Sequence, residues 1–121
     1  MGKLLVSEDI QIQLKKGVLE LCVLALLSRG DSYAYEIASR LGNGVGMGEG
    51  TIYPLMRRMQ NDGWVSTYLQ ESANGPSRKY YKLTASGQKA YQARRAEWER
   101  RLDRLGDYLE TLKSDGGDDH G

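Results

Sequence analysis

The sequence predicts a mainly α-helical fold with a small β-hairpin, made of three helices, the hairpin and one long C-terminal helix. Three observations predict this fold class. Apolar residues recur every three or four positions in three segments that precede residue 63. Two stretches with alternating side chains then flank the turn-forming cluster "ESANGPS". Beyond residue 84, a single apolar seam continues to about residue 113.

Length and composition limit the class of protein. With 121 residues the chain has room for one compact domain, and self-association is expected to bury any further large surface. The apolar run over residues 18–27 is broken by Glu20 and is too short to cross a bilayer, so a cytoplasmic protein with no membrane partner is expected. The lone Cys22 can form neither an internal disulfide nor a zinc site, and no metal or cofactor is expected.

The net charge of +1 combines a mildly basic body with an acidic end. All 17 Lys and Arg residues precede residue 114, whereas "SDGGDDHG", residues 114–121, adds three acids. The composition of this last segment predicts a disordered acidic tail. The basic body permits a phosphate-binding surface.

The first two helices are predicted from their caps and apolar spacing. The first covers residues 7–28, with Ser7 as N-cap, and its apolar face carries Leu14, Val18, Leu21, Ala25 and Leu26. The second covers "YAYEIASRLG", residues 33–42, and ends at Gly42. Its inward face is formed by Tyr33, Ile37, Ala38 and Leu41. The following "GNGVGMGEG", residues 42–50, is expected to be a loop. It lacks the Lys of a phosphate-binding loop, which disfavours nucleotide binding.

The third helix is predicted to begin after Thr51, its N-cap, and to end near Asp62 and Gly63. Pro54 is tolerated in its first turn because the backbone N–H groups there have no helical partner. The buried face is formed by Ile52, Leu55, Met56 and Met59. The opposite face, with Arg58 at its edge, carries Gly50, Tyr53, Pro54, Arg57 and Asn61.

The segments "WVSTYLQ" and "RKYYKLT" are predicted to pair as a two-stranded antiparallel hairpin with a tip of about six residues. Alternation along the second strand directs one set of side chains to one face, namely Arg78, Tyr80 and Lys82. The other face receives Lys79, Tyr81 and Leu83. One face of this strand is therefore expected to be basic and exposed to solvent.

The C-terminal helix is predicted over residues 85–113, with Thr84 as its N-cap. Its apolar seam, interrupted only by Arg95, consists of Tyr91, Trp98, Leu102, Leu105, Leu109 and Leu112. This seam can pack on the first helix of the same chain or on a second copy. The helix is long for so small a domain, which favours a homodimer to which Leu14 also contributes.

Three helices followed by a hairpin is the order of a winged helix-turn-helix, in which the third helix enters the major groove of DNA. Residues 1–84 are predicted to form this domain, and a homodimer is expected to prefer a pseudo-palindromic site in double-stranded DNA. On the exposed face of this helix, Arg57 and Arg58 are predicted to bind phosphates or the edge of guanine, and Gly50 lets the backbone come close to DNA. The two arginines alone also fit an ordinary solvated face, but Arg78, Lys79 and Lys82 add a second basic element.

Two other classes of function stay open. The first is a dimeric winged-helix adaptor that binds protein, because the fold alone does not fix the partner. The second is an enzyme. It is the weakest reading, because the single histidine, His120, lies in the tail and the acids show no pairing as general acid and base.

Residues 17–87 resemble the PadR family of transcriptional regulators in "LELCVLALLSRGDSYAYEIASRL", "GEGTIYPLMRRMQNDGWV" and "GPSRKYYKLTASG". The single C-terminal helix is similar to that of the smaller subfamily, which includes multidrug-sensing repressors. The resemblance implies a dimeric winged-helix repressor. It places at or near DNA Tyr35, Thr51, Tyr53, Pro54, Arg57, Arg78 and Lys79.

The resemblance also suggests an effector site at Trp98. In the multidrug-sensing members, a tryptophan eleven residues after the glycine of "LTxxG" stacks on flat aromatic ligands at the dimer interface, and Trp98 holds this place after Gly87. The implied site contains Trp98, Arg95, Leu102, Val18 and Leu21. Alternatively, Trp98 only fills the dimer seam. Arg94 and Arg95 stand where drug-binding members tend to be apolar, which favours an anionic or polar ligand, or none.

Overall fold

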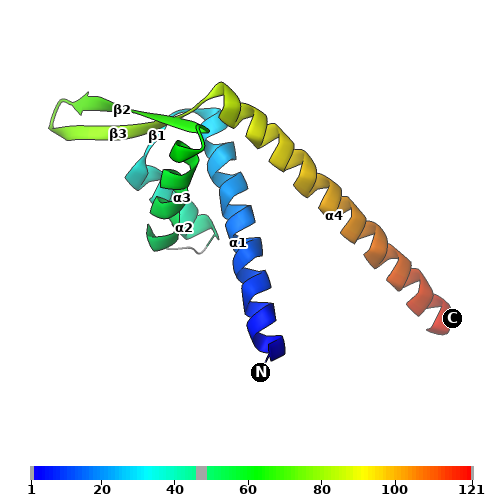
Figure 1. Cartoon of the computed structure of the whole chain (residues 1–121). Coiled ribbons are helices and arrows are strands. Elements are labelled where there is room, and N and C mark those ends of the chain that lie inside the picture. Colours follow the sequence, from blue (N-terminus) through cyan, green and yellow to red (C-terminus); the bar gives the residue numbers. More distant parts are fainter. Residues whose placement is uncertain (1, 46–48, 121) are drawn as a thin grey trace. The chain divides into compact units, whose positions relative to one another are not determined.

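The computed structural model describes the backbone of residues 2–45 and 49–120 and the side chains of residues 14–41 and 50–114. The elements are α1 (Gly2–Arg29), β1 (Ser32–Tyr33), α2 (Ala34–Val45), α3 (Glu49–Asn61), β2 (Val65–Ser72), β3 (Gly75–Leu83) and α4 (Ala85–His120) (Figure 1). They form two compact units, Met1–Tyr91 and Gln92–Gly121. The predicted mainly α fold, with a winged helix-turn-helix followed by a long helix, is confirmed.

One apolar core holds the first unit together. Each of the first three helices and the inner face of the sheet contributes side chains to it. α2 packs on α1 and α3, while α3 also packs on β2. The thirteen buried residues are Leu19, Val23, Leu24, Leu27, Ile37, Ala38, Leu41, Ile52, Leu55, Met56, Met59, Val65 and Tyr81.

The helix α1 differs from the prediction in its start and in its buried face. It begins at Gly2 rather than after Ser7, because "KLLV" contains good helix formers that continue the helix toward the N-terminus. The core face carries Leu19, Val23, Leu24 and Leu27, whereas Leu14 and Val18 of the predicted face are exposed. Residues 18–27 are apolar on nearly every side, so their spacing does not distinguish the two faces. Cys22 packs against the core, and burial raises the pKa of its thiol.

A short strand replaces the predicted start of the second helix. Tyr33 lies in β1, which pairs antiparallel with β3 through Ser32↔Tyr81 and Tyr33↔Tyr80. The sheet therefore has three strands in the order β1-β3-β2, and not two as predicted. Two residues carry too little local pattern to predict a strand, because the pairing depends on a distant partner.

The glycine-rich segment is partly helical. α2 continues past Gly42 to Val45, and α3 begins at Glu49, so the loop predicted over residues 42–50 is shorter than expected. The central part of that loop, residues 46–48, lies outside the described residues. Thr51 is inside α3 rather than its N-cap, and Pro54 falls in the second turn instead of the first.

The C-terminal end of α3 has the predicted position and a defined cap. Gly63 adopts a left-handed conformation, with φ of 79°. Its N–H donates to the Gln60 carbonyl at 3.1 Å, and the Trp64 N–H donates to the Met59 carbonyl at 2.9 Å. This hydrogen-bond pattern is a Schellman motif, which satisfies the last carbonyls of the helix and turns the chain toward β2.

The hairpin is tighter than predicted. β2 ends at Ser72 and β3 begins at Gly75, which leaves a two-residue turn instead of a tip of about six residues. The pairing is regular from Val65↔Leu83 to Gln70↔Arg78, and a register shift follows between Gln70 and Ser72. This bulge lets the ladder continue into the segment that was predicted to be a loop.

Thr84 joins the hairpin to α4 and is the predicted N-cap. Its Oγ1 accepts a hydrogen bond from the Gly87 N–H at 3.0 Å and donates to the Gly63 carbonyl at 2.6 Å. The Thr84 N–H donates to the Trp64 carbonyl at 3.0 Å. One residue therefore closes the base of the hairpin and begins α4.

The second unit is the remainder of α4. Ion pairs join successive turns, with Arg95 to Glu99 at 3.0 Å and Arg101 to Glu97 at 2.6 Å. The backbone is helical to His120, which differs from the prediction of a helix end near Lys113 and a disordered tail over residues 114–121. No proline interrupts "SDGGDDH", and extending a helix costs less than starting one.

We expect Gly87→Ala to destabilise the fold. An added Cβ would lie 2.0 Å from the Trp64 carbonyl oxygen and 2.7 Å from Leu83 Cδ1, so the base of the hairpin would have to move. Such overpacking lowers the free energy of unfolding by roughly 3 kcal/mol, measured by urea denaturation. Gly106→Ala in α4 is the control, because no described atom lies within 4 Å of its added Cβ. Equal effects of the two substitutions would contradict this account of Gly87.

Candidate nucleic-acid interface

The face of α3 that points away from the core carries the predicted residues. Ile52, Met56 and Met59 are at most 1% exposed, which fixes the rotation of the helix about its axis. Gly50, Pro54, Arg57 and Asn61 are consequently exposed on the opposite side. Tyr53 is half-buried, with its ring packed against the core. Its phenol hydroxyl can donate one hydrogen bond.

Gly50 is not required by the packing of the protein. No described atom lies within 4 Å of a Cβ added there, and Gly50 adopts no left-handed conformation. Glycine inside a helix costs about 0.5–1 kcal/mol relative to alanine. Packing within the described part of the protein therefore gives no reason for a glycine at this position.

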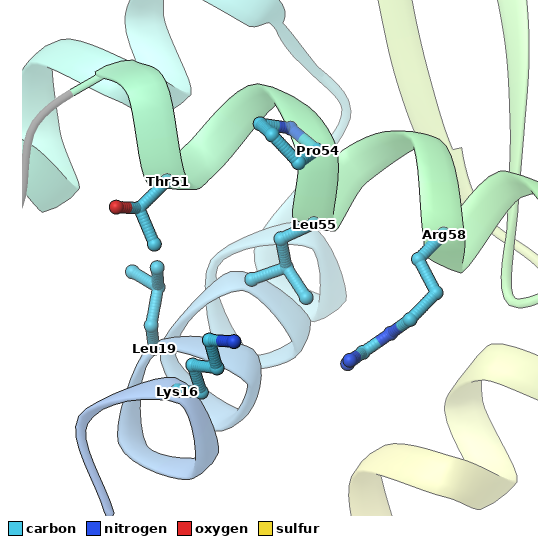
Figure 2. Close-up of a pocket in the computed structure, with 6 residues that line it drawn as sticks. All are labelled: Lys16, Leu19, Thr51, Pro54, Leu55 and Arg58. Carbon is cyan, nitrogen blue, oxygen red and sulfur yellow. The ribbon is translucent and has the colours of Figure 1, made fainter. Parts of the chain in front are cut away.

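Arg58 differs from Arg57 in the direction of its side chain. It extends toward α1, where its guanidinium forms an ion pair with Glu20. It also lines a groove between α1 and α3 with a volume of about 190 Å³, together with Lys16, Leu19, Thr51, Pro54 and Leu55 (Figure 2). The sequence places Arg58 at the edge of the exposed face. The structure shows that this edge faces α1.

The outer face of the sheet carries a tyrosine row, formed by Tyr33, Tyr80 and Tyr68 on the three strands. The Tyr68 and Tyr80 rings are stacked with centroids 5.5 Å apart, and Tyr33 meets Tyr80 edge to face at 5.5 Å. The Arg78 guanidinium lies over the Tyr33 ring, 4.5 Å from its centroid. A cation held on an aromatic ring loses less freedom when it binds a phosphate, so the row preorders Arg78.

A hydrogen bond fixes the far end of the tyrosine row. The Tyr68 hydroxyl donates to Asp31 Oδ2 at 2.7 Å, and this bond raises the pKa of the Tyr68 phenol. The sequence does not predict this contact of Asp31, because its partner lies 37 positions away. The alternating tyrosines of the two predicted strands are the signal from which the row itself was detectable.

The remaining predicted cations and donors also lie at the surface. Tyr35 is 66% exposed in the first turn of α2. Lys79 and Lys82 are exposed on opposite faces of β3, and Lys79 Nζ lies 5.5 Å from the Tyr81 ring. The first unit thus presents an exposed helix face and a basic hairpin, the two elements that contact DNA in winged-helix proteins.

The residues of the predicted effector site are distributed over both units. Val18 is exposed and Leu21 half-buried on α1. On α4, Trp98 is half-buried with the Arg101 guanidinium 5.5 Å from its ring centroid, Arg95 pairs with Glu99, and Leu102 is 60% exposed.

The residues predicted for dimerisation divide into two groups. Leu14 of α1 is exposed, as are Leu102, Leu105, Leu109 and Leu112 of α4, each between 48% and 60%. Tyr91 instead packs against the core of the first unit.

Two kinds of site are absent from the described part of the chain. No group of three or more His, Cys, Asp or Glu side chains there has the arrangement of a metal site. None of the described helices has the length and apolar character of a membrane span.

The sequence of the chain matches the model of a known protein family. The model described as "Transcriptional regulator PadR-like family" matches residues 23–93, which include α2, α3 and the whole sheet. The chain belongs to the PadR-like family. This PadR-like chain is therefore a transcriptional regulator whose fold is a DNA-binding winged helix.

Two solved structures agree with this family, and one curated protein of similar sequence is also known. A PadR-like transcriptional regulator from Bacillus cereus is 34% identical, with a TM-score of 0.73 over 80% of this PadR-like chain and 96% of that one. A PadR family transcriptional regulator from Eggerthella lenta is 29% identical, with a TM-score of 0.72 over 92% and 98%. An uncharacterised protein from Lysinibacillus sphaericus is 32% identical over 80 residues, 63% of this chain and 72% of that protein.

Proposed function

We propose that this PadR-like regulator is a homodimeric repressor that binds a pseudo-palindromic operator in the cytoplasm. The observation that carries the proposal is the outward face of α3, which presents Tyr53 and Arg57 in the same unit as the basic hairpin. In this arrangement α3 enters the major groove and the hairpin contacts the flanking backbone.

The proposed contacts have different chemical roles. Arg57 has the fork of donors that reads the O6 and N7 edge of guanine or binds phosphate. Tyr35 and Tyr53 donate hydroxyl hydrogen bonds to phosphate, as Thr51 does from the start of α3. Gly50 and Pro54 form a surface at which the backbone of α3 can come close to the DNA. Arg78 and Lys79 lie on opposite faces of β3. They bind DNA phosphates that flank the major groove occupied by α3.

We expect Arg57→Ala combined with Lys79→Ala to weaken operator binding by about tenfold to a hundredfold. Each lost phosphate contact also lowers the slope of log K against log salt by about 0.9. The operator is first selected from genomic fragments with the purified wild-type chain. Fluorescence anisotropy then measures binding over a salt series.

The matched control for this test is Arg100→Ala combined with Lys113→Ala, which removes the same two charges from exposed positions of α4. We expect the control to keep most of the affinity and the salt slope. An equal loss in the two double variants contradicts the proposed interface. Failure to select any DNA, with retention of a protein instead, favours the winged-helix adaptor.

The dimer part of the proposal rests on exposed apolar side chains in both units. Leu102, Leu105, Leu109 and Leu112 follow one another at intervals of three and four residues along α4, each about half exposed. Leu14 and Val18 form a second exposed apolar face on α1. Water contact with this much aliphatic surface is unfavourable, and a second copy removes it.

We expect Leu109→Glu to dissociate the dimer, because a carboxylate in an apolar helix seam loses its hydration without gaining a partner. Sedimentation velocity measures the mass, and operator binding should fall with it. Thr111→Glu adds the same charge to an exposed position away from the seam and should leave the dimer intact. A wild-type monomer, or equal behaviour of the two variants, contradicts this part of the proposal.

The effector part of the proposal assigns Trp98 to a planar ligand that releases the DNA. Its indole is half-buried and has a cation near its face, so an aromatic ligand with a polar or anionic group is preferred over a purely apolar one. We expect such compounds to quench tryptophan fluorescence in the wild type and much less in Trp98→Ala, where Trp64 alone emits. Equal quenching in both proteins removes Trp98 from the site.

A further inference from the structure

The link between α1 and α3 suggests a role for Arg58 that differs from that of its neighbour Arg57. Arg58 Nη2 donates to Glu20 Oε2 across 38 positions of sequence. The Glu20 side chain is only 12% exposed, whereas that of Arg58 is 52% exposed. The carboxylate of Glu20 is therefore the more deeply buried partner. The arginine reaches it from α3, the proposed recognition helix.

The surroundings of this pair explain why a polar link is useful there. α3 packs on α2 and β2, whereas along α1 it leaves the groove of about 190 Å³ beside Leu19 and Leu55 (Figure 2). Apolar contact alone fixes the rotation of α3 about its own axis but leaves it some freedom to tilt or slide on α1. An ion pair with a largely buried carboxylate restricts this motion, because breaking it would remove a cation that offsets the lost hydration of Glu20.

The position of α3 matters for binding, because the residues proposed to contact DNA act only in a narrow range of orientations. A binding site requires its side chains within about 0.5 Å and 10–20° of the productive geometry. Arg57 precedes Arg58 directly, so any tilt or slide of α3 on α1 displaces it. α1 also carries Leu14 and Val18, two residues of the proposed dimer surface, so the same pair links that surface to the recognition helix.

We propose that Arg58 is a positioning residue, which through Glu20 holds α3 on α1 in the orientation that places Arg57 on DNA. This inference rests on the proposed DNA-binding function and refines it. It assigns Arg58 to a contact within the domain rather than to base or phosphate contact. It also makes Glu20, an acid distant in sequence from α3, a requirement for specific binding.

The substitution Glu20→Gln gives opposite results under the two roles of Arg58. It removes one negative charge from a DNA-binding domain and frees Arg58, so a direct contact or simple electrostatics predicts tighter binding. Positioning predicts weaker binding to the selected operator, by about tenfold, with little change on unrelated DNA. Fluorescence anisotropy on both DNAs, over a salt series, measures the difference.

Arg58 variants complete the test. Under positioning, Arg58→Gln should weaken operator binding as much as Glu20→Gln does, with the salt slope of the wild type. Arg57→Gln should instead lower that slope by about 0.9, as loss of a phosphate contact does. The exchange of the two charges, Glu20→Arg with Arg58→Glu, should restore at least part of the affinity.

Several outcomes overturn the proposal. They are tighter operator binding by Glu20→Gln, a salt slope of Arg58→Gln that falls as in Arg57→Gln, and equal losses on operator and unrelated DNA. Thermal unfolding identifies any variant that is not folded at the assay temperature. If Arg58→Gln is the unfolded variant, Arg58→Lys replaces it in the assay, because lysine keeps the charge of Arg58 without its planar fork of donors. If the wild-type chain selects no DNA, the proposed function fails rather than this inference alone.

Discussion

The burial of one apolar stripe on α3 is the constraint on which the candidate interface depends. Ile52, Leu55, Met56 and Met59 enter the core shared with α1, α2 and the sheet. A helix with one stripe buried cannot rotate about its axis without exposing that stripe. The outward direction of Arg57 therefore follows from the burial of this stripe, and the candidate interface is a consequence of core packing.

Fixing the rotation of α3 does not by itself fix its ends or its position relative to its neighbours. At the C-terminal end, the Schellman turn at Gly63 leads into β2, and Thr84 bonds to the same turn while it caps α4. Gly87 lies so close to the Trp64 carbonyl that a larger residue does not fit without movement. The helix, the hairpin and the start of α4 thus meet in one hydrogen-bonded junction, while Glu20 and Arg58 act on the side of α1.

The distribution of apolar residues bears on the proposed assembly. α1 is apolar on two faces, of which the core takes the one with Leu19 and Val23, and the other keeps Leu14 and Val18 in water. The leucines of α4 beyond residue 100 are about half exposed in the second unit. Among the residues whose side chains the structure describes, thirteen form the core, and the proposed second copy would bury these exposed leucines in addition.

The sequence alone determined the features that depend on local chemistry. The stripe of α3, its end at Gly63, the cap at Thr84 and the alternation around Tyr81 are set by residues a few positions apart, and the structure has each as predicted. Only the tertiary structure decided which apolar face of α1 is buried, that Tyr33 adds a third strand, and that Arg58 meets Glu20 while Tyr68 meets Asp31. These contacts join residues 37 or more positions apart. Periodicity shows which residues share a face, but the neighbour that this face meets is chosen by the packing of the whole domain.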